Sequence, residues 1–249
     1  MNFDRIIAVR NDKTVYRDSD RCLKVFNNGY YTKADVLNEA LNQARLEETS
    51  LNVPKVLEVT VIDGKWTLVS EFIKGKTLAR MIKDEPERKD EFLGLLVDLQ
   101  LETQHTVCPG LMSLKEKMSR NICRTDLIAT TRYDLHMRLE AMHRDNKVCH
   151  CDFEPSNIII AEDGKAFIID WSHAAQGDPL ADSARTYLRL YLEGDESGAE
   201  RYLEIYCEKS GAESAMIKKW IPLVAAAQSI RGNAAERTAL HNWIDTAED

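Results

Sequence analysis

Six polar residues between positions 148 and 182 have types and spacings that could support chemistry: His150, Asp152, Asn157, Asp170, Asp178 and Asp182. Asn157 stands just before a short apolar run at residues 158–160, and Asp170 follows a second run at residues 166–169. Both runs are too short for a helix, and a turn signal lies between them, so we expect a β-hairpin. An antiparallel pair then brings Asn157 and Asp170 to the same end of the hairpin.

An aspartate and an asparagine that converge on one point offer hard oxygen ligands, which suit Mg²⁺ better than zinc or copper. Asp152 lies on the loop that enters the hairpin, where its carboxylate could accept the proton of an attacking hydroxyl group. The alternative is that these are ordinary turn residues, because Asp and Asn cap helices and start turns in many proteins. The combination of residue types and spacings rarely arises by accident, which favours a functional site.

The composition restricts the class of protein. The chain has 249 residues, is 44% hydrophobic and carries a formal net charge of -8. This length is enough for one large domain or two smaller lobes with a hydrophobic core. The acidic balance argues against a nucleic-acid partner, which usually requires clustered Lys and Arg. It would fit a cationic substrate, but it also keeps many proteins soluble.

The chain shows no signal for a membrane or for secretion. It has no apolar run of 18 or more residues, and charges occur too early at the N-terminus for a secretory segment. The six cysteines do not form a recognisable disulfide framework. Cys149, His150 and Cys151 lack the second pair of ligands that a zinc site needs. We therefore expect a cytoplasmic protein with reduced thiols and no membrane partner.

The elements that must position these residues fall into two groups. Short β-like runs, a helical pattern and an Asp63-Gly64 hairpin signal predict a five-stranded antiparallel sheet with one helix after the third strand. The strands are expected at residues 6–9, 14–17, 21–26, 55–61 and 66–72, and the helix at 34–46. Further helices are expected at residues 90–107, 113–124, 126–145, 180–192, 199–208, 213–231 and 235–247. The shift from β-like to helical patterns near residue 76 predicts an N-terminal lobe at residues 1–75 and a helical lobe at residues 76–249.

The motif residues resemble those of a known family. Residues 150–157 read HCDFEPSN, which resembles the H-x-D-x-x-x-x-N catalytic loop of the protein-kinase-like superfamily. Ile169-Asp170-Trp171 and the GDPLAD segment at residues 177–182 resemble the aminoglycoside phosphotransferase and choline kinase family. The D-F-G and A-P-E motifs of protein kinases do not occur. The resemblance implies an α+β, bilobal protein-kinase-like fold.

The resemblance also implies roles for the motif residues. Asp152 is the expected general base, and His150 is expected to support the loop through hydrogen bonds. Asn157 and Asp170 are the expected Mg²⁺ ligands. Asp182 is expected to cap the helix that starts at residue 180 and to brace the catalytic loop.

In the first lobe, the family pattern implies a nucleotide site. Lys24 falls on the third strand, where the family places its phosphate-binding lysine, and Glu39 falls on the following helix as its partner. If Glu39 is not the partner of Lys24, the next candidates are Glu47 and Glu48. A strand lysine and a helix glutamate exposed to solvent are the alternative.

Two segments near the expected nucleotide carry weaker signals. Glu71 and Ile73 lie in the expected connector between lobes, where backbone groups can bind an adenine edge; a plain loop is the alternative. Residues 1–28 contain no glycine, so the Gly-rich loop of protein kinases is missing. The turn at residues 10–14 must then cover the phosphates with backbone N–H groups and the Thr14 hydroxyl. Cys151 and Ser156 stand where relatives usually carry glycine. If either position needs a positive φ, a residue with a Cβ would be strained there.

The sequence therefore predicts a Mg²⁺-dependent phosphotransferase that moves the γ-phosphate of ATP to a hydroxyl group of a small molecule. The acceptor stays open among aminoglycosides, choline, amino sugars and sugar-like alcohols. A catalytically silent pseudokinase that binds nucleotide or a partner is the main alternative, and a protein-serine kinase is a third. Five residues could form an aromatic and acidic pocket for a cation, or could simply pack between helices: Tyr187, Tyr191, Glu193, Trp220 and Trp243.

Overall fold

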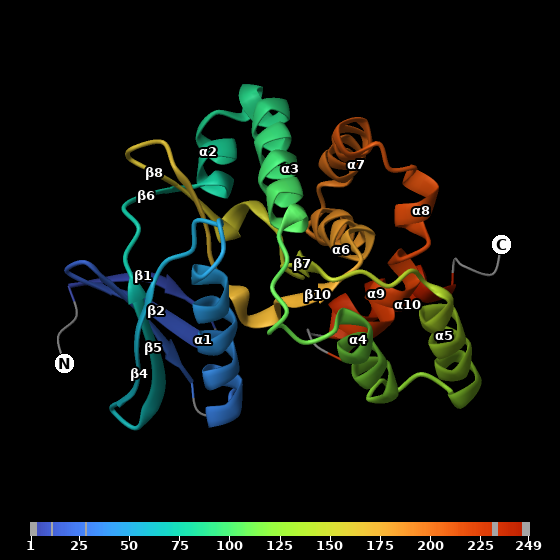
Figure 1. The fold of residues 1–249 in the computed structure, drawn as a ribbon, viewed down its shortest axis with the longest axis horizontal. Helices are drawn as coiled ribbons and strands as arrows, with labels where there is room; N and C mark the ends of the chain where they lie inside the picture. Colours follow the sequence, from blue (N-terminus) through green and yellow to red (C-terminus); the bar gives the residue numbers. More distant parts are fainter. Residues whose placement is uncertain (1–3, 11, 28, 231–233, 246–249) are drawn as a thin grey trace. The chain divides into compact units, whose positions relative to one another are not determined.

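The computed structural model describes residues 4–10, 12–27, 29–230 and 234–245 (Figure 1). The chain divides into two compact units. The first contains the residues up to Lys83 together with Pro155–His173, and the second contains Asp84–Glu154 together with the residues from Ala174 onward. The first unit is therefore built from two separate stretches of sequence, whereas the expected lobes, residues 1–75 and 76–249, are each continuous.

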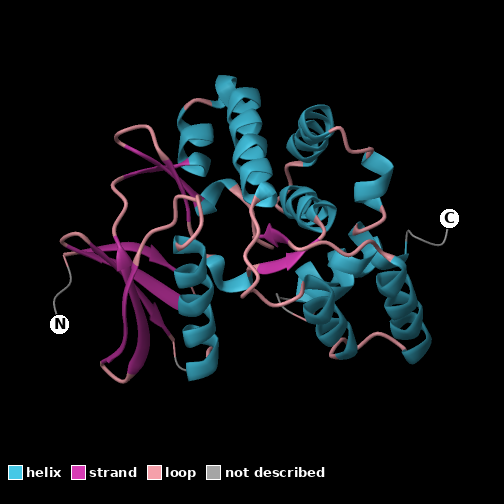
Figure 2. Ribbon diagram, in the orientation of Figure 1, coloured by secondary structure: helices cyan, strands magenta, loops and turns pink. Residues whose placement is uncertain are grey.

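An antiparallel sheet forms the centre of the first unit. Its strands follow the order β1-β2-β3-β5-β4, and each neighbouring pair is antiparallel. Their bounds are Arg5–Val9 (β1), Lys13–Asp18 (β2), Arg21–Phe26 (β3), Val56–Ile62 (β4) and Lys65–Glu71 (β5). Helix α1, Lys33–Glu47, follows β3 and lies alongside the sheet (Figure 2). The predicted sheet and its inserted helix are confirmed.

Helix α1 has a well-defined start and one buried face. Thr32 caps it: the Thr32 hydroxyl accepts from the Asp35 N–H, and the Asp35 carboxylate accepts from the Thr32 N–H at 2.8 Å. The buried face carries Val36, Ala40 and Glu39 at helical spacing. Val36 and Ala40 join Phe26 and Leu68 in a hydrophobic cluster. Packing of this face therefore carries the Glu39 carboxylate into the interior beside the sheet.

The predicted hairpin forms in the second stretch of the first unit. Strand β6, Gly75–Thr77, pairs with β8, Ile158–Ala161, which pairs with β9, Ala166–Ile168. The Ile169 N–H donates to the Asn157 carbonyl at 2.9 Å, which brings Asn157 and Asp170 to one end of the hairpin. Gly75 is required for close approach, because a Cβ there would lie 2.1 Å from the Ile160 carbonyl oxygen.

Short helical turns flank the hairpin. The 3₁₀ turn η2, Pro155–Asn157, precedes β8, and η3, Trp171–His173, follows Asp170. Trp171 is fully buried, and its indole N–H donates to the Ile168 carbonyl at 2.9 Å. The Asn42 amide of α1 donates to the Trp171 carbonyl at 3.2 Å. These contacts attach the segment around Asp170 to the helix that carries Glu39.

The second unit is mainly helical. Helix α2, Leu78–Asp84, lies at the end of the first stretch, and the turn η1, Pro86–Arg88, follows it. The later helices are α3 Lys89–His105, α4 Leu114–Cys123, α5 Ala129–Ala141, α6 Pro179–Leu192, α7 Glu196–Ser210, α8 Ser214–Lys218, α9 Ile221–Gln228 and α10 Ala234–Asp245. Strands β7, Lys147–Cys149, and β10, Ala175–Gly177, pair antiparallel. No helix in the described part of the chain is long and apolar enough to cross a membrane.

Two further details differ from the sequence prediction. The helix expected at residues 213–231 is two helices, α8 and α9, which join near Trp220; Pro222 lies in the first turn of α9, where a proline has no N–H to continue a preceding helix. The cap of α6 is Asp178, not Asp182, because the Asp178 carboxylate accepts from the Leu180 N–H at 2.8 Å. The predicted helix ends at residues 231 and 247 lie outside the described residues.

Candidate active site

Four charged side chains meet in the interior of the first unit. Lys24 of β3 forms an ion pair with Glu39 of α1, and its ammonium nitrogen lies 3.1 Å from Asp170 Oδ1. Lys13, the first residue of β2, lies 2.9 Å from Asp170 Oδ2. The side chains of Lys24, Glu39 and Asp170 are 15%, 3% and 13% exposed. Glu47 is used elsewhere, since its carboxylate accepts from the Val56 N–H at 2.7 Å.

The charges in this cluster stabilise one another. Burial alone would lower the pKa of the Lys24 ammonium, but the carboxylates of Asp170 and Glu39 outweigh burial and raise this pKa above its usual value. Burial alone would raise the pKa of Asp170, but Lys24 and Lys13 hold it well below its usual range. Lys24 and Asp170 therefore both stay charged at neutral pH.

The cluster opens onto a cavity of about 220 Å³ within the first unit. Lys24, Asp170 and Asn157 line it, as do the predicted connector residues Glu71 and Ile73. Apolar side chains complete much of the wall: Ile7, Val15, Leu68, Phe72, Ile159 and Ile169. An apolar wall with charged groups at one cluster suits a ligand that has a flat base and a polyanionic part.

Lys13 lines this cavity, whereas Thr14 is not among its described lining residues. Strand register explains the difference. Val15 pairs with Lys24, so the alternation of side chains along β2 puts Lys13 and Val15 on the Lys24 face and Thr14 on the other face. Lys13 was not predicted, because only the register between β2 and β3 decides which of these two adjacent residues faces Lys24. Thr14 stays a prediction that this geometry does not favour.

Asn157 and Asp170 offer oxygen atoms to a metal ion at the same cavity. Among the described residues, no group of three or more His, Cys, Asp and Glu side chains is placed to hold a metal by itself. Two protein ligands suit Mg²⁺, which usually binds one or two protein oxygens together with phosphate oxygens and water. The donor set therefore fits a magnesium ion that arrives with a nucleotide.

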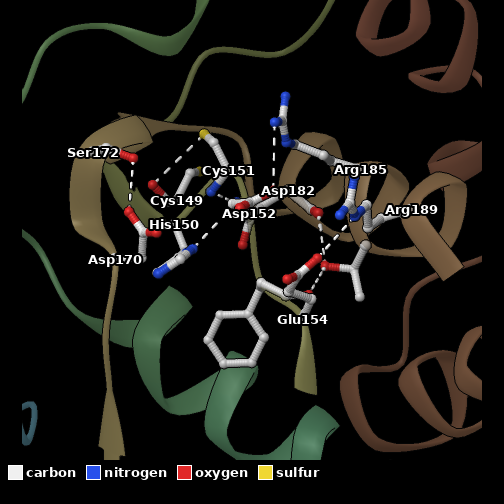
Figure 3. A network of polar contacts seen from close by, with 12 residues as sticks. Cys149, His150, Cys151, Asp152, Glu154, Asp170, Ser172, Asp182, Arg185 and Arg189 are labelled. Atoms are coloured by element: carbon white, nitrogen blue, oxygen red, sulfur yellow. Dashed lines mark hydrogen bonds and ion pairs between the residues drawn. The ribbon is translucent and has the colours of Figure 1, made fainter. Parts of the chain in front are cut away.

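In the second unit, the residues that precede the hairpin form a tightly held loop (Figure 3). His150 is fully buried, and its Nδ1 accepts a hydrogen bond from the Asp152 N–H at 3.2 Å. Its ring meets the ring of Phe153 edge-on, with centroids 5.6 Å apart. His150 thus holds the backbone at Asp152 through a hydrogen bond, and its supporting role in catalysis stays a prediction.

One face of α6 contacts this loop residue by residue (Figure 3). The contacting residues are spaced at i, i+3, i+4 and i+7, as one helix face requires: Asp182, Arg185, Thr186 and Arg189. They meet four consecutive loop residues in the same order: Cys151, Asp152, Phe153 and Glu154. Helix α6 therefore acts as a rigid support for the loop that carries Asp152.

The contacts along this face are of different kinds. The Asp182 carboxylate accepts from the Cys151 N–H at 2.6 Å, and the Thr186 hydroxyl donates to the Phe153 carbonyl at 3.0 Å. Arg189 Nε lies 2.8 Å from the Glu154 carboxylate and 3.0 Å from that of Glu193. The predicted bracing of the loop by Asp182 agrees with this geometry.

Arg185 is the contact of α6 with the expected base. Its guanidinium lies 3.6 Å from Asp152 Oδ1. Its Nε is buried and has no hydrogen-bond partner among the residues that the structure describes. A buried donor without a partner is costly, whereas the Arg185 side chain as a whole is 19% exposed. Arg185 was not predicted as a site residue, because in the sequence only its spacing of three from Asp182 distinguishes it.

Cys151 adopts a backbone conformation that suits glycine. Its φ is +60°, and its Sγ is buried. Ser156 is not among the described residues with positive φ. The strain expected at a glycine-like position therefore falls on Cys151, next to Asp152.

Substitutions at Cys151 should separate this strain from packing. Cys151→Ala and Cys151→Gly both remove the thiol, but only glycine removes the Cβ that disfavours positive φ. We expect Cys151→Gly to be more stable than Cys151→Ala by about 0.5–1 kcal/mol, after the greater freedom of glycine in the unfolded chain is subtracted. Urea unfolding of the two variants measures the difference. Equal stability, or a more stable alanine variant, would contradict strain at this position.

The aromatic residues expected to form a cation pocket pack mainly against one another. Trp220 is buried, and Trp243 meets Tyr191 and Tyr187 edge-on, with centroids 4.9 and 6.2 Å apart. Tyr187 and Trp243 do border a second cavity, but its charged lining is basic: Arg138, Lys218 and Lys219. Helix packing, the alternative explanation, accounts better for these residues than a pocket for a cation.

Comparison with protein families matches residues 6–217 to APH, the phosphotransferase enzyme family. The chain belongs to this family. A search of curated proteins gave no match. The match spans all of the motif residues, because it includes Lys24, the loop at residues 150–157 and the segment through Asp182.

Solved structures of phosphotransferases share the fold. A thermostable mutant of aminoglycoside phosphotransferase APH(4)-Ia, in a ternary complex with ADP and hygromycin B, has a TM-score of 0.69 at 13% identity, covering 97% of this chain and 92% of that one. Choline kinase LicA from Streptococcus pneumoniae has a TM-score of 0.64 at 17% identity, covering 99% and 92%. Aminoglycoside-3'-phosphotransferase of type VIII has a TM-score of 0.63 at 18% identity, covering 97% and 92%. At these identities the likeness establishes the protein-kinase-like fold alone.

Proposed function

We propose that this phosphotransferase moves the γ-phosphate of ATP to a hydroxyl group of a small molecule. The observation that carries the proposal is the buried cluster of Lys24, Glu39 and Asp170 beside Asn157, on a cavity with an apolar wall. Phosphoryl transfer needs mainly positioning and neutralisation of charge, and these groups are suited to both tasks. Membership of the phosphotransferase family supports the same reaction class.

The residues divide the work as follows. Lys24, held by Glu39, steadies the nucleotide phosphates, and the backbone near Glu71 and Ile73 receives the base. Asn157 and Asp170 would hold Mg²⁺, which neutralises phosphate charge when it is bound. Asp152 accepts the proton of the acceptor hydroxyl, while His150 keeps the Asp152 backbone in place.

The surroundings of Asp152 favour a sugar-like acceptor over choline. Arg189 pairs with the carboxylates of both Glu154 and Glu193 and offsets one of their two negative charges, which leaves less negative charge for a quaternary ammonium. The Arg185 side chain is 19% exposed, and a terminal nitrogen of its guanidinium lies 3.6 Å from the Asp152 carboxylate. A polyol or amino sugar can place a second oxygen near its reacting hydroxyl to accept from Arg185, and choline has none to offer. We therefore propose a polyhydroxylated acceptor in a cytoplasmic setting.

A substrate screen tests this function. Purified protein is incubated with Mg-ATP and single acceptors, namely choline, several aminoglycosides, amino sugars and simple sugars. ADP release is measured by a coupled assay, and ³¹P NMR identifies any phosphate ester formed. We expect a phosphomonoester of a polyhydroxylated acceptor and none of choline.

Two results would contradict the proposal in different ways. Calorimetry that detects no binding of Mg-ATP would remove the nucleotide site. Binding of Mg-ATP without any ester product across the screen would favour the silent nucleotide-binding alternative.

A further inference from the structure

Lys13 is an unusual residue for the wall of a cavity. Lysine is almost never fully buried unless it is paired, because removal of its ammonium from water is costly. The Lys13 side chain is only 9% exposed, and its ammonium lies 2.9 Å from Asp170 Oδ2. The sequence therefore places a second cation, besides Lys24, beside the same carboxylate.

The two lysines divide the carboxylate of Asp170 between them. Lys24 lies 3.1 Å from Oδ1, and Lys13 lies 2.9 Å from Oδ2. The Ser172 hydroxyl also donates to Oδ1, at 3.0 Å. Each oxygen of the Asp170 carboxylate is thus paired with one ammonium group. A metal ion at Asp170 would lie within a few ångströms of one of them, and two adjacent cations repel strongly in a partly buried site.

Charge within the cluster is balanced without a ligand. Lys13 and Lys24 contribute two positive charges, and Glu39 and Asp170 contribute two negative charges. If Asp170 bound a metal ion in the absence of phosphate, the buried Lys13 ammonium would lose its partner, which is unfavourable. A phosphate group that entered together with the metal would supply a new partner for Lys13.

We propose that Lys13 is a second phosphate-binding lysine, and that it exchanges Asp170 for a nucleotide phosphate when Asp170 binds the metal ion. The inference rests on the proposed function and adds to it how the phosphates are held. Residues 1–28 contain no glycine, so Lys13 provides from β2 a charge that takes the place of the N–H groups of a Gly-rich loop.

This exchange makes the binding of metal and nucleotide mutually dependent. A metal ion that binds alone takes Asp170 from Lys13 and leaves Lys13 without a partner. When metal and phosphate bind together, Asp170 pairs with the metal ion and Lys13 pairs with the phosphate. Each ligand should therefore strengthen the binding of the other, by the same factor in both directions. The ion pair of Lys13 with Asp170 is the source of that coupling.

Isothermal titration calorimetry tests the proposal in the full chain. The probes are Mn²⁺ alone, AMP-PNP alone, and AMP-PNP in the presence of saturating Mn²⁺. The variants are Lys13→Gln, Lys13→Arg, and the control Lys74→Gln. Lys74 is a matched control because it is a lysine of the same unit, is paired with Glu162, and has a side chain that is 68% exposed.

In the wild-type protein we expect AMP-PNP to strengthen Mn²⁺ binding at least about tenfold, within the usual range of coupling between sites. Lys13→Gln should bind Mn²⁺ alone more tightly, bind AMP-PNP with Mn²⁺ about tenfold more weakly, and lose most of the coupling. Lys13→Arg, which keeps the charge, should retain most of the nucleotide affinity. Lys74→Gln should resemble the wild type.

The outcomes separate this proposal from the function on which it rests. A wild-type protein that binds no AMP-PNP with Mn²⁺ would overturn the proposed function. A wild type that binds normally, with unchanged affinity and coupling in Lys13→Gln, would overturn the role of Lys13 alone. If Lys13→Gln does not fold by circular dichroism, Lys13→Arg decides: loss of most of the wild-type coupling in this variant, which keeps the charge, would contradict exchange between ion pairs.

Discussion

Replacement of Asp152 by asparagine is expected to lower kcat at least about a hundredfold, which is the usual scale for the loss of a general base. Asparagine keeps the size of the side chain but cannot accept a proton from the attacking hydroxyl. The main contacts of the loop use other groups, namely the Cys151 N–H, the Phe153 carbonyl and the Glu154 carboxylate. We therefore expect the fold and the affinity for Mg-ATP to stay close to those of the wild type.

Steady-state kinetics with the acceptor found in the screen measures this effect, and calorimetry with Mg-AMP-PNP measures the binding. Asp134→Asn is a matched control, because Asp134 lies on α5 with a side chain that is 65% exposed and pairs only at the surface with Arg138. The control should have normal kcat. A near-normal kcat in Asp152→Asn would remove Asp152 from the mechanism.

Replacement of Asp170 by asparagine is expected to weaken Mg-dependent binding of nucleotide at least about a hundredfold. Loss of a group that only orients a metal ligand commonly lowers metal affinity 10- to 100-fold, and a ligand itself should matter at least as much. The variant should also be less stable by about 3 kcal/mol, because Lys13 and Lys24 lose a shared carboxylate in a partly buried position. Calorimetry measures the first effect and urea unfolding the second.

The stability difference should depend on pH in one direction. The folded state holds the pKa of Asp170 well below its usual range, chiefly because Lys24 and Lys13 outweigh burial. Its contribution is therefore present above the unfolded carboxyl pKa of about 3.9 and is lost as the pH falls through the lower, folded pKa. The gap in the free energy of unfolding between wild type and Asp170→Asn should be largest above about pH 5 and should shrink below about pH 4.

Glu58→Gln serves as the control, since Glu58 is an exposed acid on β4 of the same unit. It should change neither nucleotide binding nor stability appreciably. Unchanged Mg-dependent affinity in Asp170→Asn would contradict a metal role. A gap that widened as the pH fell below 4 would contradict an ionised Asp170.

Much of the first unit could be predicted because its signals are local. The Asp63-Gly64 turn, the alternation of the strands and the two apolar runs before and after residue 164 each specify their own structure. The pair of Lys24 and Glu39 was implied by the family resemblance, which places a lysine on the third strand and its glutamate partner on the following helix. The convergence of Asn157 and Asp170 followed from the geometry of one hairpin.

Features that depend on register or on competition between similar residues were not predictable. Lys13 and Thr14 are adjacent, and only the pairing of Val15 with Lys24 decides which of them faces the cavity. Asp178 and Asp182 are both able to cap a helix. The Asp182 carboxylate accepts a hydrogen bond from the Cys151 N–H instead, and Asp178 is the cap. Arg185 acquires its meaning only when α6 lies against the loop, a contact between segments distant in sequence.

The strand order β6-β8-β9 has a consequence for the order in which the chain folds. During synthesis from the N-terminus, β1–β6 are complete long before β8 and β9 exist, because α3, α4 and α5 intervene. Until the hairpin emerges, β6 lacks its neighbour, and Lys13 and Lys24 lack the carboxylate of Asp170. The first unit must therefore await residue 173, and its long-range pairing should form late and slowly. Folding of this unit ends with the arrival of the acid that completes its cluster of charges.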